Sequence, residues 1–445
     1  MTDSETLQER RLRWMSVACH TVLIAMSIGW CGGAATALDL RGATRDLSPE
    51  RASRFAVFED FKINGVCGTD RLELASRFGV NTVRGYTISL KDNQTLGLLD
   101  RAHALGMRVV LSEWMPEHGR QGTRDGKYHV DYRERGDQLV AKFREKVEAL
   151  GDHPAVLMWG LGNEVGLDPE YLRVVNRMSE ALHELYPNAI SSLTMINAKP
   201  ENIAKIKRYA PDIDVLGVQS YSTGAIENGI RNMEEHWGRP YYYSEFNARG
   251  PWNFEKTSWG QAVDSLPGEK VEQVRRAYRA IDRAPGCLGS TIFVWGHFVV
   301  NRPTYFSLLL SMDPTGEDKA AERLVTPQAE AMGRHFLGRR PLENRSPVLR
   351  RLSFADGEGH ASVSPAQPFT VLASATDGDG ESVTLNAWVV SSVGRRLEIA
   401  TPLTLGERGR IDLVAPSEPG VYLVLVYATD GRGGGSGSTL PLRVQ

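Results

Sequence analysis

Two glutamates, Glu164 and Glu245, each end an apolar run that predicts a buried β-strand. Glu164 closes the stretch WGLGNE, and Glu245 closes the stretch YYYSE. We therefore expect each strand to present its glutamate at its carboxyl end. Two carboxyl groups on two strands of one barrel are the pair that cleavage of a glycosidic bond needs, one as acid and base and one as nucleophile. Retention of configuration requires them to stand about 5–5.5 Å apart.

These two carboxyl groups need different surroundings. The acid must keep its proton near neutral pH, which requires a raised pKa, whereas the nucleophile must stay ionised. Arg84, at the end of a predicted strand, can hold a carboxylate in a fixed fork and favour its ionised form. The structural alternatives are a barrel-rim salt bridge for Arg84, a carboxylate in a first helical turn for Glu164 and an ion pair for Glu245.

The stretch from Phe61 to about Gly338 alternates short β-rich runs with amphipathic helical runs. The predicted strands are Phe61–Gly65, Asn81–Gly85, Arg108–Leu111, Ala155–Gly160, Ile190–Met195, Val215–Gln219, Pro240–Ser244 and Leu288–Val294. The predicted helices are Asp70–Phe78, Asn93–Leu105, Arg133–Leu150, Pro169–Leu185, Glu201–Tyr209, Ala225–Trp237, Glu269–Arg283 and Pro327–Leu337. Eight such units in series predict a (β/α)8 (TIM) barrel over residues 61–340, after a lead-in over 38–60. Because side chains at the carboxyl ends of barrel strands meet in one pocket, the fourth and seventh strands can bring the two glutamates together.

The last hundred residues have a different pattern. After a linker over 341–347, short alternating strands separated by turn clusters predict an immunoglobulin-like β-sandwich over 348–445. Tyr422 matches the tyrosine that closes a corner in such folds. Asp377, Asp379 and Asp430 stand next to glycines, and we favour turns over a calcium site for them.

The segment His153–Glu164 resembles the acid/base strand of clan A retaining glycoside hydrolases, and Pro240–Phe246 resembles their nucleophile strand. The families that these segments resemble most are glycoside hydrolase family 2, the β-galactosidase and β-glucuronidase group, and the family 72 β-1,3-glucanosyltransferases. The similarity covers about residues 60–340. Family 2 enzymes carry a jelly roll and an immunoglobulin-like domain before the barrel, whereas in this chain the small β domain follows it.

The resemblance implies that Glu164 is the general acid/base and Glu245 the nucleophile. It also implies that Asn163 bonds the sugar 2-hydroxyl, that Arg84 orients the nucleophile and that Tyr221 contacts it.

Aromatic residues near the predicted strand ends are candidates for sugar contacts. The resemblance implies that Trp295 is the platform under the sugar, and core filling is the alternative. Tyr86, Trp114, Trp252 and Glu113 lie in βα-loop positions, where substrate binding and plain loop packing are both open. The stretch from Trp114 to Tyr132 is predicted to be a long loop that can shape acceptor subsites.

Composition and charge argue against several other classes of protein. A net charge of −2 offers no excess of positive field for nucleic acid or an anionic membrane surface. A metal-dependent barrel hydrolase needs several His or Asp ligands at its strand ends. The ten histidines of this chain are scattered, and none forms a His-x-His pair on a predicted strand. A phosphate-binding barrel would want a Gly-rich loop after the seventh or eighth strand, and none follows. We expect a carbohydrate partner and no metal, nucleotide or other cofactor, because carboxyl groups alone supply the protons and the nucleophile.

The N-terminus predicts export. Arg10, Arg11 and Arg13 precede the mostly apolar run Trp14–Trp30, and a small-x-small site ends at Ala37. Residues 1–37 therefore read as a signal peptide or a signal anchor, which places the protein in the periplasm or outside the cell. An uncleaved anchor would be its contact with the membrane.

The sequence predicts an exported retaining β-glycoside hydrolase that acts on an oligo- or polysaccharide, with a β-glucan favoured by the resemblance. A β-glucan transglycosylase would use the same residues. A non-catalytic carbohydrate-binding protein on a disabled barrel is the third hypothesis, and retention of both glutamates argues against it.

Overall fold

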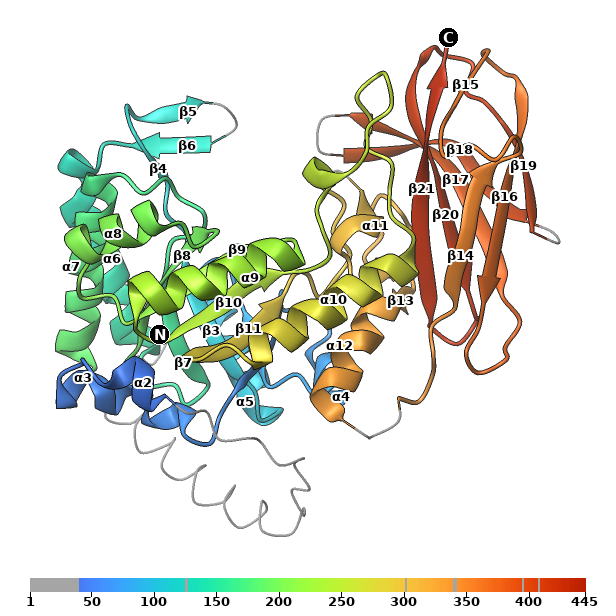
Figure 1. Cartoon of the computed structure of the whole chain (residues 1–445). Coiled ribbons are helices and arrows are strands. Elements are labelled where there is room, and N and C mark those ends of the chain that lie inside the picture. Colours follow the sequence, from blue (N-terminus) through green and yellow to red (C-terminus); the bar gives the residue numbers. More distant parts are fainter. Residues whose placement is uncertain (1–39, 125–126, 301, 339–341, 394–395, 407–408) are drawn as a thin grey trace, which may run out of the picture.

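The computed structural model describes residues 40–124, 127–300, 302–338, 342–393, 396–406 and 409–445. Eight parallel strands form a closed barrel in the order β1-β11-β10-β9-β8-β7-β3-β2 (Figure 1). They are β1 Ile63–Cys67, β2 Thr82–Arg84, β3 Arg108–Glu113, β7 Val156–Leu161, β8 Ser191–Ile196, β9 Val215–Ser220, β10 Tyr241–Phe246 and β11 Cys287–Ile292. Neighbours in the barrel are neighbours in the chain, so the predicted TIM barrel is confirmed.

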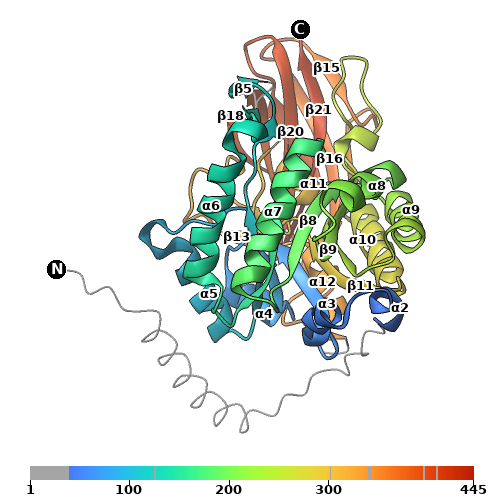
Figure 2. The same ribbon diagram turned by 90° about the vertical axis from the view of Figure 1, so that its left-hand side faces the viewer.

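Helices surround these strands on the outside (Figure 2). They are α4 Leu72–Arg77, α5 Gln94–Ala104, α6 Tyr132–Leu150, α7 Pro169–Leu185, α8 Pro200–Tyr209, α9 Thr223–Asn232, α10 Pro267–Asp282 and α12 Pro327–Leu337. A π-helical turn, Met233–Trp237, continues α9. Side-chain oxygens cap several of them: Asp131 and Asp168 accept backbone N–H bonds at the starts of α6 and α7. All eight predicted helices are present, with ends shifted by a few residues.

Short elements close the amino-terminal end of the barrel. These are α2 Arg41–Thr44, α3 Pro49–Ser53 and the 3-10 turn Arg54–Phe58, drawn in blue at the bottom of Figure 1. Phe55 and Phe58 from this segment form one apolar cluster with Val110, Met158 and Tyr242 from three barrel strands. Apolar side chains therefore fill this end of the barrel.

The segment after β3 contains a small sheet instead of the predicted loop. Its strands are β4 Glu117–His118, β5 Gly122–Arg124 and β6 Lys127–Val130, in the order β4-β6-β5. Figure 1 shows this sheet above the barrel strands, at the upper left. A short helix, α11 Pro303–Phe306, and the strand pair β12 Leu309–Ser311 and β13 Arg323–Val325 lie between β11 and α12 in the chain.

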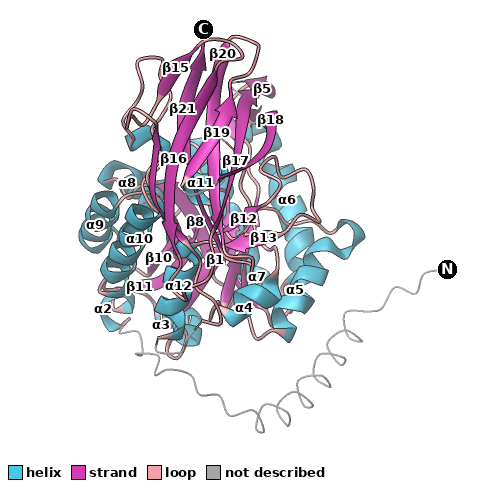
Figure 3. Cartoon of the chain, turned by 90° about the vertical axis from the view of Figure 1, so that its right-hand side faces the viewer, coloured by secondary structure: helices cyan, strands magenta, loops and turns pink. Residues whose placement is uncertain are grey.

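The C-terminal region is a β-sandwich beside the barrel (Figure 3). One sheet has the order β14-β16-β19, from Val348–Phe354, Pro368–Thr376 and Arg410–Val414. The other has the order β15-β21-β20-β17-β18, from Ala361–Val363, Gly435–Val444, Gly420–Thr429, Thr384–Val393 and Arg396–Gly406. Tyr422 donates its hydroxyl hydrogen to the backbone oxygen of Glu418 at 2.9 Å, which confirms the predicted tyrosine corner. Arg302 of the barrel donates to the hydroxyl of Thr439 in β21 at 2.9 Å and ties the two parts together.

The structure also places two cysteines and bears on the N-terminal region. Cys67 ends β1 and Cys287 begins β11, so they lie at opposite barrel ends, and both are buried free thiols. The predicted signal segment, residues 1–37, lies outside the described residues. Within the described part of the chain, no helix has the length and apolar character needed to cross a membrane.

Candidate active site

Glu245, the fifth residue of β10, is the centre of a hydrogen-bonded group at the carboxyl end of the barrel. It is 5% exposed. Its Oε1 accepts from Nη1 of Arg84 and from the hydroxyl of Tyr86, both at 2.8 Å. Its Oε2 accepts from the hydroxyl of Tyr221 at 2.6 Å. A guanidinium and two hydroxyl donors stabilise a carboxylate and fix its orientation.

A β-bulge turns Glu245 toward this group. Tyr241 and Tyr243 belong to the apolar layer between strands and helices, and in a regular strand residue 245 would point to the same side. The pairing of β10 with β9 shifts between Tyr243 and Glu245, so Ser244 is an extra residue in β10. Such an insertion re-aims the side chains that follow it. The bulge therefore places the carboxylate inside the barrel mouth.

Arg84 joins Glu245 to Asn163. The guanidinium is fully buried, and its Nη2 donates to Oδ1 of Asn163 at 2.6 Å. Gln219, the penultimate residue of β9, donates to the same Oδ1 at 2.7 Å. Because two donors meet the oxygen, the amide NH2 of Asn163 remains as the group that can donate to a ligand. Gln219 was not predicted, although a glutamine that interrupts an apolar strand near its carboxyl end was a usable signal.

Glu164 follows the end of β7 in an unusual backbone conformation. Its φ is +55° and that of Gly162 is +97°, so the chain turns sharply as the strand ends. Residues other than glycine in this region are uncommon, and they cluster at functional sites. Burial, and then the negative charge of Glu245, raise the pKa of Glu164 to about 7, against smaller lowering effects of Arg84 and Lys127. This carboxyl group can hold a proton near neutral pH.

The two tyrosines that contact Glu245 remain protonated donors. Burial, and then the charge of Glu245, raise the pKa of Tyr221, and the charge of Glu164 acts in the same direction. Burial also raises the pKa of Tyr86 well above its ordinary value. Arg84 contacts both Glu245 and Asn163, the residue before Glu164, so the backbone that carries Glu164 lies at the same end of the barrel as Glu245.

Trp295 does not join this group. It is 1% exposed, and its ring packs against Phe78 at 5.8 Å between ring centroids. Phe293, which follows the end of β11, is instead an aromatic side chain that contacts both tyrosines. Its ring meets Tyr86 and Tyr221 edge-on at 6.5 and 6.2 Å between centroids.

The loop residues predicted to contact substrate divide into two kinds. Trp114 and Trp252 are 52% and 58% exposed. The ring of Trp114 lies 6.4 Å from that of Tyr128 in β6. Glu113, in contrast, forms an ion pair with Lys146 of α6 at 2.7 Å, which gives it a structural role.

Two of the three aspartates of the sandwich, Asp377 and Asp430, form turns. Oδ1 of Asp377 and Oδ1 of Asp430 each accept two backbone N–H bonds within their own turns. Carboxylate oxygens of Asp377, Glu381 and Asp430 lie within 4.8 Å of one another. Asp379 instead accepts the backbone N–H of Arg345 at 2.7 Å.

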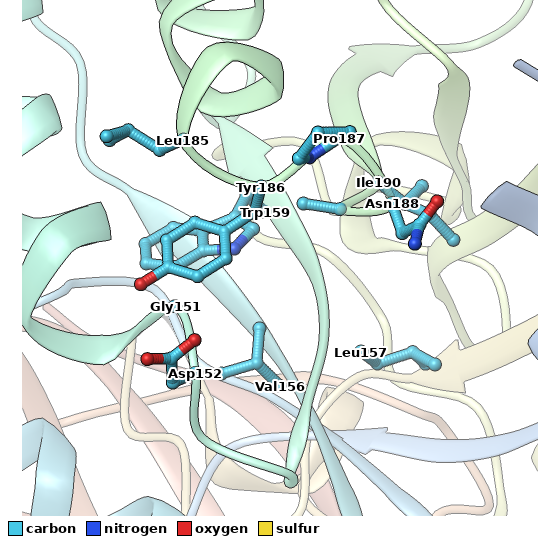
Figure 4. A pocket seen from close by; sticks show the side chains of 11 residues that line it. Gly151, Asp152, Val156, Leu157, Trp159, Leu185, Tyr186, Pro187, Asn188 and Ile190 are labelled. Carbon is cyan, nitrogen blue, oxygen red and sulfur yellow. The ribbon is translucent and has the colours of Figure 1, made fainter. Parts of the chain in front are cut away.

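A surface pocket lies at the other end of the barrel (Figure 4). It is lined by residues before and within the starts of β7 and β8, among them Asp152, Val156 and Asn188. Glu164 and Glu245 are at the carboxyl ends of their strands, so this pocket is not part of their site.

Comparison with known proteins shows similarity at the level of fold. No protein-family model matches the chain, and no curated protein does. Among solved structures, it is similar to Bacteroides uniformis β-glucuronidase 2 covalently bound to cyclophellitol-6-carboxylate aziridine (15% identity, TM-score 0.47, covering 87% of this chain and 46% of that one). It is also similar to the FMN-binding β-glucuronidase of Facaelibacterium prausnitzii L2-6 (14% identity, TM-score 0.46, covering 86% of this chain and 56% of that one). A third similar structure is a GH2 β-galacturonidase from Eisenbergiella tayi bound to glycerol (16% identity, TM-score 0.43, covering 62% of this chain and 51% of that one). The chain thus spans about half the length of these structures.

Proposed function

We propose that this protein is a retaining β-glycoside hydrolase with Glu245 as nucleophile and Glu164 as general acid and base. One arrangement carries the proposal: a carboxylate held by three donors is linked through Arg84 to Asn163, and the next residue, Glu164, is a carboxyl group whose pKa burial raises to about 7. This difference between two neighbouring carboxyl groups is what a two-step displacement at an anomeric carbon requires.

The reaction has two steps. In the first, Glu245 attacks the anomeric carbon while Glu164 gives its proton to the departing glycosidic oxygen, so the C–O bond breaks and a glycosyl ester forms. In the second, Glu164 takes a proton from water, and the resulting hydroxide attacks the same carbon and releases Glu245. Two inversions leave the β configuration unchanged.

The surrounding residues have separate parts in this proposal. Arg84 and Tyr86 fix Oε1 of the nucleophile, and Tyr221 fixes Oε2. The free amide NH2 of Asn163 donates to the sugar 2-hydroxyl, and Gln219 helps to hold that amide. Phe293 lies beside the tyrosines, and we assign to it the place under the sugar that the resemblance gave to Trp295.

The proposed substrate is an oligo- or polysaccharide outside the cytoplasm, because residues 1–37 predict export. A β-glucan remains the favoured class on the resemblance of the two catalytic strands. Both the hydrolase and the transglycosylase pass through the same glycosyl ester and differ in whether water or a sugar hydroxyl attacks it.

Chemical rescue tests the assignment. Glu164→Ala and Glu245→Ala should each abolish turnover of an unactivated substrate, whereas Glu148→Ala, an exposed position on α6, should retain it. With an activated aryl β-glycoside, azide should give the β-glycosyl azide from Glu164→Ala and the α-glycosyl azide from Glu245→Ala. Opposite anomers, or full activity in either variant, would refute the two roles.

A further inference from the structure

We infer that the small β4-β6-β5 sheet, together with Trp114 in the segment that leads to it, binds the leaving group. In this leaving-group wall, Trp114 and Tyr128 bind a sugar ring of the departing part of the glycan. This inference rests on the proposed function and adds to it that the leaving group is itself a sugar.

The first observation is a pair of exposed aromatic rings. Trp114 is 52% and Tyr128 38% exposed, and their planes make an angle of 32° at 6.4 Å between centroids. At that spacing the two rings are not in face-to-face stacking contact. Gln121 donates to the Tyr128 hydroxyl at 3.2 Å and holds that ring in place. Exposed rings with polar neighbours suit the C–H faces of a sugar, whose hydroxyl groups stay in water.

The second observation is the position of these rings relative to Glu164. Trp114 directly follows β3, which pairs with β7 up to Glu113 and Leu161, three residues before Glu164. Lys127, next to Tyr128, pairs with Glu117, which also accepts the backbone N–H of Gly166, two residues after Glu164. The general acid protonates the oxygen of the leaving group. Rings on the side of Glu164 therefore face the part of the substrate that departs.

Glu117 fixes this wall to the segment that carries Glu164. Its Oε1 accepts from Nζ of Lys127 at 2.5 Å, and its Oε2 accepts from the backbone N–H of Gly166 at 2.9 Å. One carboxylate thus links β4, β6 and the chain two residues after the acid. We assign Glu117 as a positioning residue.

Trp252, the third exposed aromatic residue near the strand ends, contacts the nucleophile's partner instead. Its ring meets that of Tyr221 edge-on at 5.5 Å, and Tyr221 donates to the nucleophile. Trp252 therefore does not share the leaving-group wall.

The experiment compares two substrates with the same transferred sugar. A β-glycosyl fluoride has a leaving group too small to reach Trp114, whereas the matching β-linked disaccharide has a sugar there. With β-glucosyl fluoride against cellobiose and laminaribiose, or the same series in the sugar that wild type accepts, Trp114→Ala and Tyr128→Ala should lower kcat/KM for the disaccharide about tenfold more than for the fluoride. Leu405→Ala, at an exposed apolar position of the sandwich, should change neither.

Glu117 has its own readout. Glu117→Ala should raise KM for the disaccharide more than for the fluoride, and Glu117→Gln, which keeps an oxygen for the Gly166 N–H, should restore much of the loss. Equal effects of the Trp114 and Tyr128 substitutions on both substrates would overturn the inference and leave the proposed function intact. Failure of wild type to hydrolyse any glycosyl fluoride or disaccharide would overturn both.

Discussion

Arg84 and Glu245 form a buried ion pair, with 2.8 Å between Nη1 and Oε1 and exposures of 0% and 5%. The same guanidinium holds the side-chain oxygen of Asn163. Charges removed from water are stable when each keeps its partner, and loss of one partner leaves the other unpaired. One cation therefore fixes both the proposed nucleophile and the amide that we expect to meet the sugar.

Two replacements of Arg84 should distinguish the effect of its charge from the effect of its planar guanidinium. Arg84→Met leaves Glu245 without its counter-charge, and we expect the free energy of unfolding in urea to fall by about 3 kcal/mol. Arg84→Lys keeps the charge, so this variant should be more stable than Arg84→Met. A lysine cannot reach Glu245 and Asn163 in one planar fork, so kcat/KM should still fall about 100-fold or more. Arg101→Met, which breaks an exposed pair with Glu73, should cost less than about 1 kcal/mol. Equal losses of stability in both Arg84 variants would contradict the role of the charge.

The pH dependence of activity should follow Glu164. The acid works in its protonated form, so kcat/KM should be high below pH 7 and fall as the pH rises through about 7, the pKa that burial and Glu245 give to this group. Glu164→Gln, assayed on an aryl glycoside whose good leaving group keeps the variant active, should lose this alkaline limb because the titrating carboxyl group is gone. An unchanged alkaline limb in that variant would assign the titration to another group.

The same pKa predicts a change in stability. A carboxyl group that binds its proton more tightly when folded destabilises the protein as the pH rises above the unfolded value, near 4.5, and the effect is complete above about 7. Glu164→Gln is neutral at every pH. We expect it to match wild type at pH 4 and to exceed the wild-type free energy of unfolding by about 1–3 kcal/mol at pH 8. Urea titrations at the two pH values measure this, and a gain that does not grow with pH would contradict it.

Much of this site could be predicted because strand periodicity fixes where barrel strands end. Glu164, Glu245, Arg84 and Asn163 each stand at or just after a strand end, and a closed parallel barrel brings such positions together. Periodicity could not reveal the bulge at Ser244, which decides the direction of Glu245. The β4-β6-β5 sheet was also missed, because its strands are two to four residues long and mostly polar.

Trp295 shows the limit of the same reasoning. The sequence Phe293-Val294-Trp295 offers two aromatic residues near one strand end, and a strand end known only to within a few residues does not say which one faces the site. The resemblance implies Trp295, whereas the structure buries that ring against Phe78 and places Phe293 beside Tyr86 and Tyr221.

Asn163 should be tested with a substrate that lacks its partner. If its amide donates to the sugar 2-hydroxyl, Asn163→Ala and a 2-deoxy aryl glycoside should each lower kcat/KM about 100-fold, and the variant should show little further loss on the 2-deoxy substrate. Asn188→Ala, in the pocket at the far end of the barrel, should leave the preference for the 2-hydroxyl unchanged. If the two losses in activation free energy instead add in the double test, Asn163 acts on something other than this hydroxyl.

Phe293 and Trp295 should respond to truncation in opposite ways. Trp295→Ala removes a side chain that is 1% exposed, so the free energy of unfolding should fall by about 3–5 kcal/mol, with a smaller effect on kcat/KM of the folded fraction. Phe293→Ala removes a partly exposed ring beside Tyr86 and Tyr221, so kcat/KM should fall about tenfold or more at a smaller cost in stability. Urea unfolding and initial rates on the same preparations separate the two effects. The reverse pattern, with wild-type stability and lost activity in Trp295→Ala, would return the platform to Trp295.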